Sequence, residues 1–597
     1  MADIIESYSE LIKEAFITPI RTVTVIDDEY PTLLSLITVF SDKNATKLDL
    51  NNVNINRLKN IISMCHSTYR WSIDVFDGQT PEFGRADPVP SHIRHSDLII
   101  LDYHLDGEGP EDEGERARNI IKSLSKSNHY NLALVHTKGS DGDIKTVFTE
   151  ILRDLICISP KHELLPSKEI TEKIEEWIAD NEDDIDYKWL QEDVGLYYVL
   201  KIYLSPTPKR CIDPRTPEHP FHNFSEEIIR AAASADVTPV DLMKWRFAEI
   251  LANNNVKFSE EVDSSLECFW GEETNYISTG RVFISVIKKG IDDPKKELID
   301  SLINALTKRN ASPMHLLMAK MRFELDEKGI EQAVKIIGNR YAQAGWLYNL
   351  LKNADDDSAH DKAINLHWEQ LATASRQELR NFSKRIIAAV KYTYPGNEKQ
   401  FVKTFFRECI NQQDLTLGHL NAFSCSMPIS NTHLMTGTVL DIEGETWVCI
   451  TPACDLVPGQ KISQWESRIG QSYLVFKAVK LEAARLETAN KNANRNNYIY
   501  LNVGGTLSAY EISNDNPSWD TFYAADLGCY DRNFSLTLFC ARECTELGEE
   551  TPLKMKKLTA YAIAELRYEY ALNLLHKFGS SQTRVGLDFQ CKNNMWA

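Results

Sequence analysis

Short apolar runs that end in polar residues recur through the first part of the chain. The clearest covers residues 98–101, Leu-Ile-Ile-Leu, and is followed directly by Asp102. A continuous apolar run of this length indicates a strand that is buried on both faces, as in a parallel sheet. Four further runs predict strands of the same sheet, at residues 21–26, 71–76, 132–135 and 155–158.

The segments between these strands have helical composition, notably residues 115–126 and 143–153. Strands that alternate with helices at this spacing predict a right-handed, doubly wound parallel sheet. We therefore expect an α/β domain over residues 1–165, with a short amphipathic helix at residues 3–16 before its first strand.

The pattern of apolar and polar residues changes twice along the rest of the chain, which predicts a multidomain protein. Residues 166–415 consist mainly of segments with helical spacing, so we expect an α-helical middle. Over residues 416–597, β-branched and aromatic runs predict a β-rich domain, a small barrel or sandwich, with a hairpin at residues 435–450. Residues 558–578 are expected to form a final helix.

The composition is that of a globular protein, with 43% hydrophobic and 25% charged residues in a chain of 597. The net charge of −20 argues against a broad nucleic-acid-binding face. No apolar run of about 18 residues occurs, so no membrane helix is expected. The 12 cysteines are scattered and no secretory signal precedes them, which predicts a cytoplasmic protein with reduced thiols.

Polar side chains suited to phosphate chemistry follow the predicted strands. All the strands of a parallel sheet end at one edge, so these side chains should converge there. Three carboxylates brought together repel one another unless a cation lies among them, and oxygen ligands of this kind suit Mg²⁺. The metal, a hydroxyl and an ammonium would neutralise a phosphoryl group on Asp102. The strand-end residues are Asp27, Asp28, Asp102, Thr137 and Lys161.

This order of strand-end residues resembles the receiver domain of response regulators, the acceptor half of two-component signalling. The resemblance covers roughly residues 20–165 and implies a flavodoxin-like fold. It implies that Asp102 takes a phosphoryl group from a histidine kinase, and that Thr137 and Lys161 contact that group. The Mg²⁺ ligands that it implies are Asp27, Asp28, Asp102 and the backbone carbonyl of His104.

Two positions depart from the receiver pattern. The family usually has proline after its lysine, whereas here Pro160 precedes Lys161, so Lys138 beside Thr137 is a rival for the lysine role. The family also tends to carry an aromatic residue three positions before the lysine, where Ile158 stands. Signal transmission by the usual pairing of a threonine and an aromatic residue is therefore not expected.

The resemblance implies a phosphoacceptor with at most autodephosphorylation activity, rather than an enzyme. Large receivers whose C-terminal parts do not bind DNA resemble components of two-component-like bacterial anti-phage systems such as Detocs. A regulatory or phosphate-buffering role in such a pathway is therefore expected. The expected partners are a histidine kinase and either a downstream effector or a second receiver protein.

Two alternatives remain open on the sequence. The first is an effector enzyme controlled by its receiver, with chemistry at Cys454 and Asp455 in the β-rich domain. Its candidate partner side chains are Cys449, His433, Cys540 and Cys544. The spacings of the cysteines do not match a zinc knuckle. The second alternative is a scaffold in which the receiver is never phosphorylated and serves as an interaction surface.

Overall fold

The computed structural model describes most of the chain in two compact units. The first unit is Met1–Gly338 with Glu369–Ala389, and the second is Asn339–Trp368 with Val390–Ala597. The residues described are 7–41, 52–78, 91–105, 114–137, 143–181, 194–205, 208–217, 219–259, 266–290, 293–337, 339–352, 354, 357–458, 466–512, 517–543 and 553–582.

A seven-stranded sheet forms the centre of the first unit, in the order β2-β1-β3-β4-β7-β6-β5. The first five strands in this order are parallel, whereas β6 and β5 continue the sheet antiparallel. The prediction of a doubly wound parallel sheet is therefore confirmed. The strands are β1 (Thr22–Ile26), β2 (Ser72–Phe76), β3 (Leu98–Asp102), β4 (Asn131–Thr137), β5 (Glu267–Trp270), β6 (Asn275–Ser278) and β7 (Val282–Lys288).

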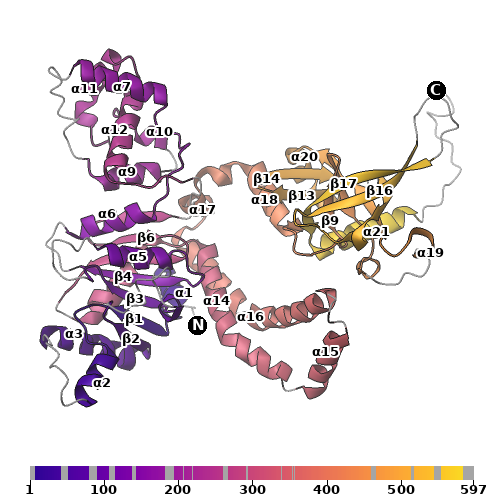
Figure 1. Cartoon of the computed structure of the whole chain (residues 1–597), viewed down its shortest axis with the longest axis horizontal. Helices are drawn as coiled ribbons and strands as arrows, with labels where there is room; N and C mark the ends of the chain where they lie inside the picture. The colour runs from indigo at the N-terminus through magenta and orange to yellow at the C-terminus, as the bar shows by residue number, and fades with distance from the viewer. Residues whose placement is uncertain are drawn as a thin grey trace. The chain divides into compact units, whose positions relative to one another are not determined.

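Helices cover both faces of this sheet, because alternate residues of each strand point to opposite sides (Figure 1). In β3, Ile99 and Leu101 pack in one core with α5 (Glu115–Leu124) and α6 (Asp143–Leu155). Leu98 and Ile100 pack in the other core. That second core also takes side chains from α1 (Tyr8–Phe16), α3 (Asn52–Ser63), α13 (Ser301–Arg309), α14 (Pro313–Ile337) and α16 (Asp357–Thr393).

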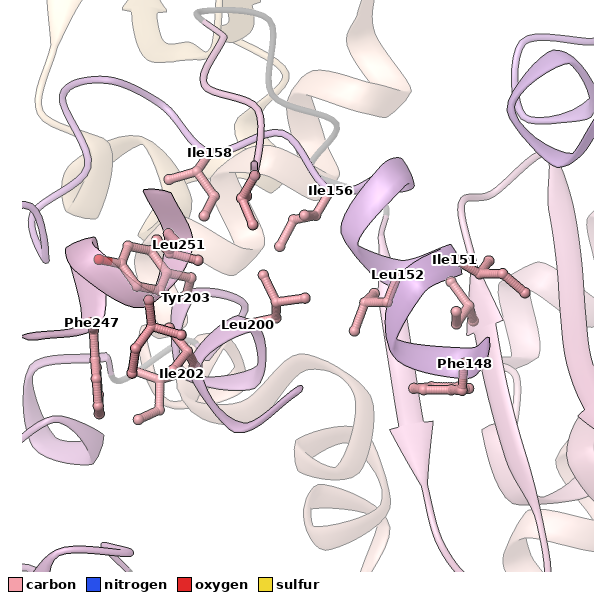
Figure 2. Close-up of a cluster of buried hydrophobic side chains, with 14 of the residues drawn as sticks. Phe148, Ile151, Leu152, Ile156, Ile158, Leu200, Ile202, Tyr203, Phe247 and Leu251 are labelled. Carbon is pink, nitrogen blue, oxygen red and sulfur yellow. The ribbon is translucent and has the colours of Figure 1, made fainter. Parts of the chain in front are cut away.

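The prediction of a strand at residues 155–158 is wrong. Leu155 ends α6, and Ile158 makes only an isolated bridge to Phe258 outside the sheet. Ile156 and Ile158 instead pack into a hydrophobic cluster with side chains of α9 (Leu196–Tyr203) and α12 (Pro239–Asn253) (Figure 2). A short apolar run has this ambiguity because it can fill a helical core as well as a sheet.

A helical insertion separates α6 from the last three strands of the sheet. Its main helices are α7 (Lys168–Asp180), α9, α11 (Ser225–Ser234) and α12. Ser167 and Thr238 cap α7 and α12 by accepting hydrogen bonds from backbone N–H groups of the first turn. The insertion shares one continuous core with the α5–α6 face of the sheet. The sheet therefore extends well beyond residue 165, where the sequence placed its boundary.

The second unit contains an antiparallel barrel, in agreement with the predicted β-rich domain. Six strands close because β16 pairs with both β15 and β17. The interior holds buried aromatic and apolar side chains, including Trp447, Phe476 and Phe522. The strands of this sheet are β8 (Ser426–Met427), β9 (Thr438–Ile442), β10 (Glu445–Cys449), β11 (Leu474–Lys480), β15 (Trp519–Ala524), β16 (Ser535–Glu543) and β17 (Leu553–Leu566).

The predicted hairpin is confirmed by β9 and β10, which pair antiparallel across Glu443 and Gly444. Both turn residues have positive φ, 54° and 86°, as a two-residue hairpin turn requires. The predicted helix at 558–578 is only half right. Residues up to Leu566 form β17, and α21 (Tyr568–Gln582) follows. In β17 the buried side chains alternate, which is the period of a strand rather than of a helix.

The remaining elements are shorter or lie outside the two sheets described above. A three-stranded sheet in the second unit has the order β12-β14-β13. Its strands are β12 (Glu482–Ala484), β13 (Tyr498–Val503) and β14 (Thr506–Glu511). The other helices are α2 (Leu33–Ser41), η1 (Met64–Tyr69), α4 (Ser91–Arg94), α10 (Pro208–Cys211), η3 (His222–Phe224), η4 (Lys295–Asp300), α15 (Arg340–Lys352), α17 (Glu398–Phe406), η5 (Arg407–Asn411), α18 (Gln413–Cys425), η6 (Ala453–Asp455), α19 (Glu466–Ile469), α20 (Leu486–Lys491), η7 (Ala493–Arg495) and η8 (Asp526–Gly528).

The position of β7 inside the sheet has a consequence for stability. Ile284 in β7 is fully buried, so Ile284→Ala should lower the free energy of unfolding by about 2–5 kcal/mol. The matched control Ile229→Ala, at a side chain that is 40% exposed on α11, should change it by less than about 1 kcal/mol. Urea unfolding of the full chain measures both values. Equal effects of the two substitutions would contradict the buried position of β7.

Candidate functional site

Four strand ends meet at the carboxyl edge of the parallel sheet. Asp102 is the last residue of β3 and Thr137 is the last of β4. Asp27 follows β1, and its N–H donates to the carbonyl of Phe76 at 3.0 Å. Lys289 follows β7, and its N–H donates to the carbonyl of Thr137 at 2.8 Å. The backbone thus places Asp27, Asp102, Thr137 and Lys289 at neighbouring strand ends.

The Lys289 ammonium lies among three carboxylates. Its Nζ is 2.7 Å from Oδ2 of Asp27, 3.0 Å from Oδ2 of Asp102 and 3.1 Å from Oε2 of Glu29. The side chains of Lys289, Asp27 and Asp102 are 6%, 2% and 2% exposed, so solvent screens these contacts little. The ring of Tyr30 also faces the ammonium, with 5.3 Å from Nζ to the ring centroid. This ion cluster is the electrostatic centre of the site.

Neither lysine proposed from the sequence holds this position in the described structure. Lys161 is exposed in a turn before α7, because the segment that was expected to be the fifth strand leaves the sheet. Lys138 lies outside the described residues. Lys289 was not recognised from the sequence, because 144 residues, 138–281, separate β4 from β7. A signal was present: residues 282–287 are an apolar run broken only by Ser285, and two lysines follow it.

The buried charges shift one another's pKa values. Burial and the nearby charge of Asp102 raise the pKa of Asp27, although Lys289 opposes this. Burial and the charges of Asp102 and Glu29 also raise the pKa of Asp28. Burial alone would lower the pKa of Lys289, but the carboxylates of Asp27 and Asp102 hold it above its usual range. The ammonium therefore stays charged between the two buried aspartates.

The carboxylates fit a divalent cation. One oxygen each from Asp27, Glu29 and Asp102 can be chosen so that all lie within 4.8 Å of one another. Oδ1 of Asp102 is buried and has no hydrogen-bond partner among the described residues, so its lone pairs are available to a ligand. Hard oxygen donors of this kind suit Mg²⁺. The expected Asp28 is half-buried beside this group, whereas Glu29, which the sequence did not single out, belongs to it.

A second group of buried polar side chains lies next to the ion cluster. His136 is paired in register with Asp102, and its Nε2 is 3.4 Å from Oε1 of Glu297 on η4. Glu297 also contacts Arg57 of α3. Burial and the charges of Arg57 and Lys289 hold the pKa of His136 well below its usual range, so its imidazole is neutral. Arg57, His136 and Glu297 each keep a buried polar atom without a hydrogen-bond partner in the described chain.

Two other residues predicted for this site, Thr137 and His104, lie at or just after strand ends. Thr137 is fully buried at the end of β4, next to the Lys289 backbone. His104 lies two residues after Asp102, and the role of its carbonyl in metal binding stays a prediction. With Lys289 as the lysine, the position three residues earlier is Val286, which is buried in the core. An aromatic side chain is thus missing at this position for either lysine.

The alternative site at Cys454 and Asp455 lies in η6 of the second unit. Both residues are exposed, and Sγ of Cys454 is 3.4 Å from Oδ1 of Asp455. Cys449 and Cys540 instead face the barrel interior, where burial raises the pKa of both thiols. His433 is buried, and Cys544 lies outside the described residues. The described structure therefore does not join these two cysteines with Cys454 into one site.

Comparison with known proteins agrees with the fold and the strand-end residues. Residues 19–185 match the family model described as Response receiver domain. This part of the chain is a receiver domain, the phosphoacceptor class of signalling module. The match ends before Lys289, which the structure adds to the site. Searches of curated proteins and of solved structures found no significant match. None of the helices in the described ranges has the length and apolar character needed to cross a membrane.

Removal of the ammonium should destabilise the fold in a pH-dependent way. Lys289→Met leaves two buried carboxylates unpaired, which should cost about 3–5 kcal/mol near neutral pH. A carboxyl whose pKa is raised by folding favours the folded state only while it is protonated. The loss should therefore shrink as the pH falls toward about 5 and grow as the pH rises. Thermal unfolding of Lys289→Met and wild type at several pH values, in a metal-free buffer, measures this difference.

Two further variants make that experiment specific. Lys161→Met removes an exposed lysine and should leave the unfolding temperature nearly unchanged. Asp102→Asn added to Lys289→Met removes one of the unpaired charges and should restore part of the lost stability. A loss that is independent of pH, or one that Asp102→Asn makes worse, would contradict the assigned ion cluster.

Proposed function

We propose that this chain is a phosphate-accepting signalling protein whose receiver takes a phosphoryl group from a histidine kinase onto Asp102. The observation that carries this proposal is the buried contact of Lys289 with the carboxylates of Asp27 and Asp102. Holding two carboxylates and an ammonium out of water is costly for a fold, and such strongly perturbed groups concentrate at functional sites. The match of residues 19–185 to the receiver family supports the same function.

The reaction proposed is a transfer between two side chains. A carboxylate oxygen of Asp102 attacks the phosphorus of the kinase phosphohistidine, the P–N bond breaks, and the imidazole leaves with the electron pair. The product is an acyl phosphate on Asp102. The charge on the transferred group must be neutralised in the transition state, and positioned cations provide most of such catalysis.

The residues of the site have separate roles in this proposed transfer. Lys289 already lies 3.0 Å from Oδ2 of Asp102, which places its ammonium next to the new acyl phosphate. Thr137 at the adjacent strand end has a hydroxyl that suits a phosphoryl oxygen. Asp27, Glu29 and Asp102 would hold Mg²⁺, with Asp28 close by. When bound, the metal supplies charge neutralisation for the phosphoryl oxygens. The chain itself has at most an autodephosphorylation activity in this proposal.

Phosphorylation with a small donor tests the proposal. Incubation with acetyl phosphate and Mg²⁺, followed by intact-mass analysis, should add one phosphoryl group to the wild type and none to Asp102→Asn. Lys289→Ala should lower the rate at least about tenfold, because a charge-assisted contact to the developing charge is lost. The matched control Lys161→Ala should react like the wild type, and chelation of Mg²⁺ should abolish the reaction. An adduct that persists in Asp102→Asn would contradict the assignment.

We further propose that the receiver buffers phosphate in a two-component-like pathway, as in bacterial anti-phage systems of the Detocs kind. Val286 supports this role, because an aromatic side chain at its position would be expected to relay the modification. A buffer holds the phosphoryl group and thereby withdraws it from other acceptors. Its partners would be the kinase and a second receiver or effector.

A competition experiment tests the buffering role. The cognate kinase, radiolabelled on its histidine, is mixed with a second receiver that it phosphorylates. The wild-type chain should lower the label on that receiver in proportion to its own concentration. Asp102→Asn should leave the label unchanged. Equal labelling of the second receiver with and without the wild-type chain would contradict a phosphate buffer, even if Asp102 is phosphorylated.

A further inference from the structure

A cavity of about 290 Å³ lies at the amino edge of the receiver sheet, opposite the edge that carries Asp102. Three of its lining residues mark the starts of strands: Arg21 before β1, Asp97 before β3 and Leu132 in β4. The outer wall comes from α1 and the first half of α14, which both belong to the first unit. Nothing in the phosphoryl-transfer chemistry uses this space.

The walls of the cavity are largely apolar and partly aromatic. Phe16 and Ile20 line it from the α1 side, and Met318, Ala319 and Phe323 line it from α14. Met318 is 53% exposed although it is a large apolar side chain. An engineered apolar cavity of about 150 Å³ already binds benzene. The space here therefore suits one aromatic ring together with a small substituent.

Among the described residues, the polar groups of the lining leave one positive charge, that of Arg322, without an ion-pair partner. Arg309 is paired with Glu267, with 3.0 Å between Nε and Oε2, and Arg21 is paired with Glu327. Arg322 instead donates to the carbonyl of Tyr130 at 3.4 Å and lies 3.1 Å from Nδ1 of His129. In the described part of the chain it contacts no carboxylate.

The acidic residues of the lining do not cancel this charge. Oδ2 of Asp97 accepts hydrogen bonds from the N–H groups of Arg21 and Thr22 and from the Thr22 hydroxyl. Its Oδ1 lies 3.3 Å from Nε2 of His129, so the carboxylate is fully engaged. Asp326, another lining residue, is exposed one helical turn beyond Arg322, and the described structure shows no ion pair between the two. An arginine that makes no ion pair binds a carboxylate readily, because the two carboxylate oxygens match the planar N–H donors of the guanidinium.

We propose that this cavity binds an aromatic monocarboxylate, with the ring between α1 and α14 and the carboxylate on Arg322. A single guanidinium that makes no ion pair in the described structure matches one negative charge better than the two charges of a phosphate monoester. A pocket that combines apolar walls with a few convergent polar groups is the usual form of a small-molecule site. The proposal does not depend on the phosphorylation of Asp102.

Isothermal titration of the full chain with benzoate tests the site. Neutral benzamide, which keeps the ring and the shape, and phenyl phosphate, which carries more charge, serve as comparison probes. Benzoate should bind more tightly than either of them. Arg322→Gln should weaken benzoate at least about tenfold while it leaves benzamide little changed, since only the charge-assisted contact is lost.

Two further variants separate the cavity from other sites. Ala319→Trp fills the space and should abolish the binding of all three probes, whereas Arg230→Gln, at an exposed arginine of α11, should change nothing. Unfolding temperatures show which variants are intact. The proposal is overturned if benzoate does not bind the wild type, or binds no better than benzamide. It is equally overturned if benzoate binds with unchanged affinity to a folded Arg322→Gln or Ala319→Trp variant.

Discussion

The contact of the Lys289 ammonium with the carboxylates of Asp27 and Asp102 is the constraint around which the first unit is built. Two buried aspartates whose oxygens lie within 4.8 Å would repel by a few kcal/mol even at an effective dielectric constant of about 20. In this structure the neutralising lysine reaches them from the sheet itself, at the end of β7 next to β4. The chain between β4 and β7 must therefore bring β7 back beside β4.

The helical insertion satisfies that constraint because its ends can meet at little cost. The entropy of closing a long connection grows only slowly with its length, by about 0.6 kcal/mol for each doubling. The insertion also adds burial of its own, since Ile156 and Ile158 enter a core shared with α6, α9 and α12. The β5–β6 hairpin then returns the chain to the sheet beside β7. Two parallel strands that pair require a crossover connection, and here that connection is a folded helical subdomain.

The sequence predicted the site residues that follow from the local pattern of apolar and polar positions. It missed the lysine, because the position of the lysine depends on which strands pair in the sheet. Asp27, Asp102 and Thr137 each end a short apolar run, and the structure places all three at one edge. The lysine could not be chosen in this way, because residues 155–158 and residues 282–287 are both apolar runs followed by a lysine. Only the partner strand distinguishes them. The same limit applies to residues 558–566, whose alanines and leucines also suit a helix.

The two edges of the receiver sheet are joined by strands but not by an evident switch. Asp97 at the cavity directly precedes β3, which ends with Asp102 at the ion cluster, and all five residues of β3 are buried. Coupling between two sites requires an element with two states that each ligand binds differently. The group of Arg57, His136 and Glu297 is polar, unlike the apolar residues of β3. It lies beside the ion cluster and holds buried atoms without hydrogen-bond partners in the described chain, and the charge of Lys289 helps to lower the pKa of His136. A phosphoryl group that draws Lys289 toward itself would change that charge balance. A modification at Asp102 would therefore act first on these polar side chains, which lie next to the ion cluster, rather than on the cavity at the opposite edge of the sheet.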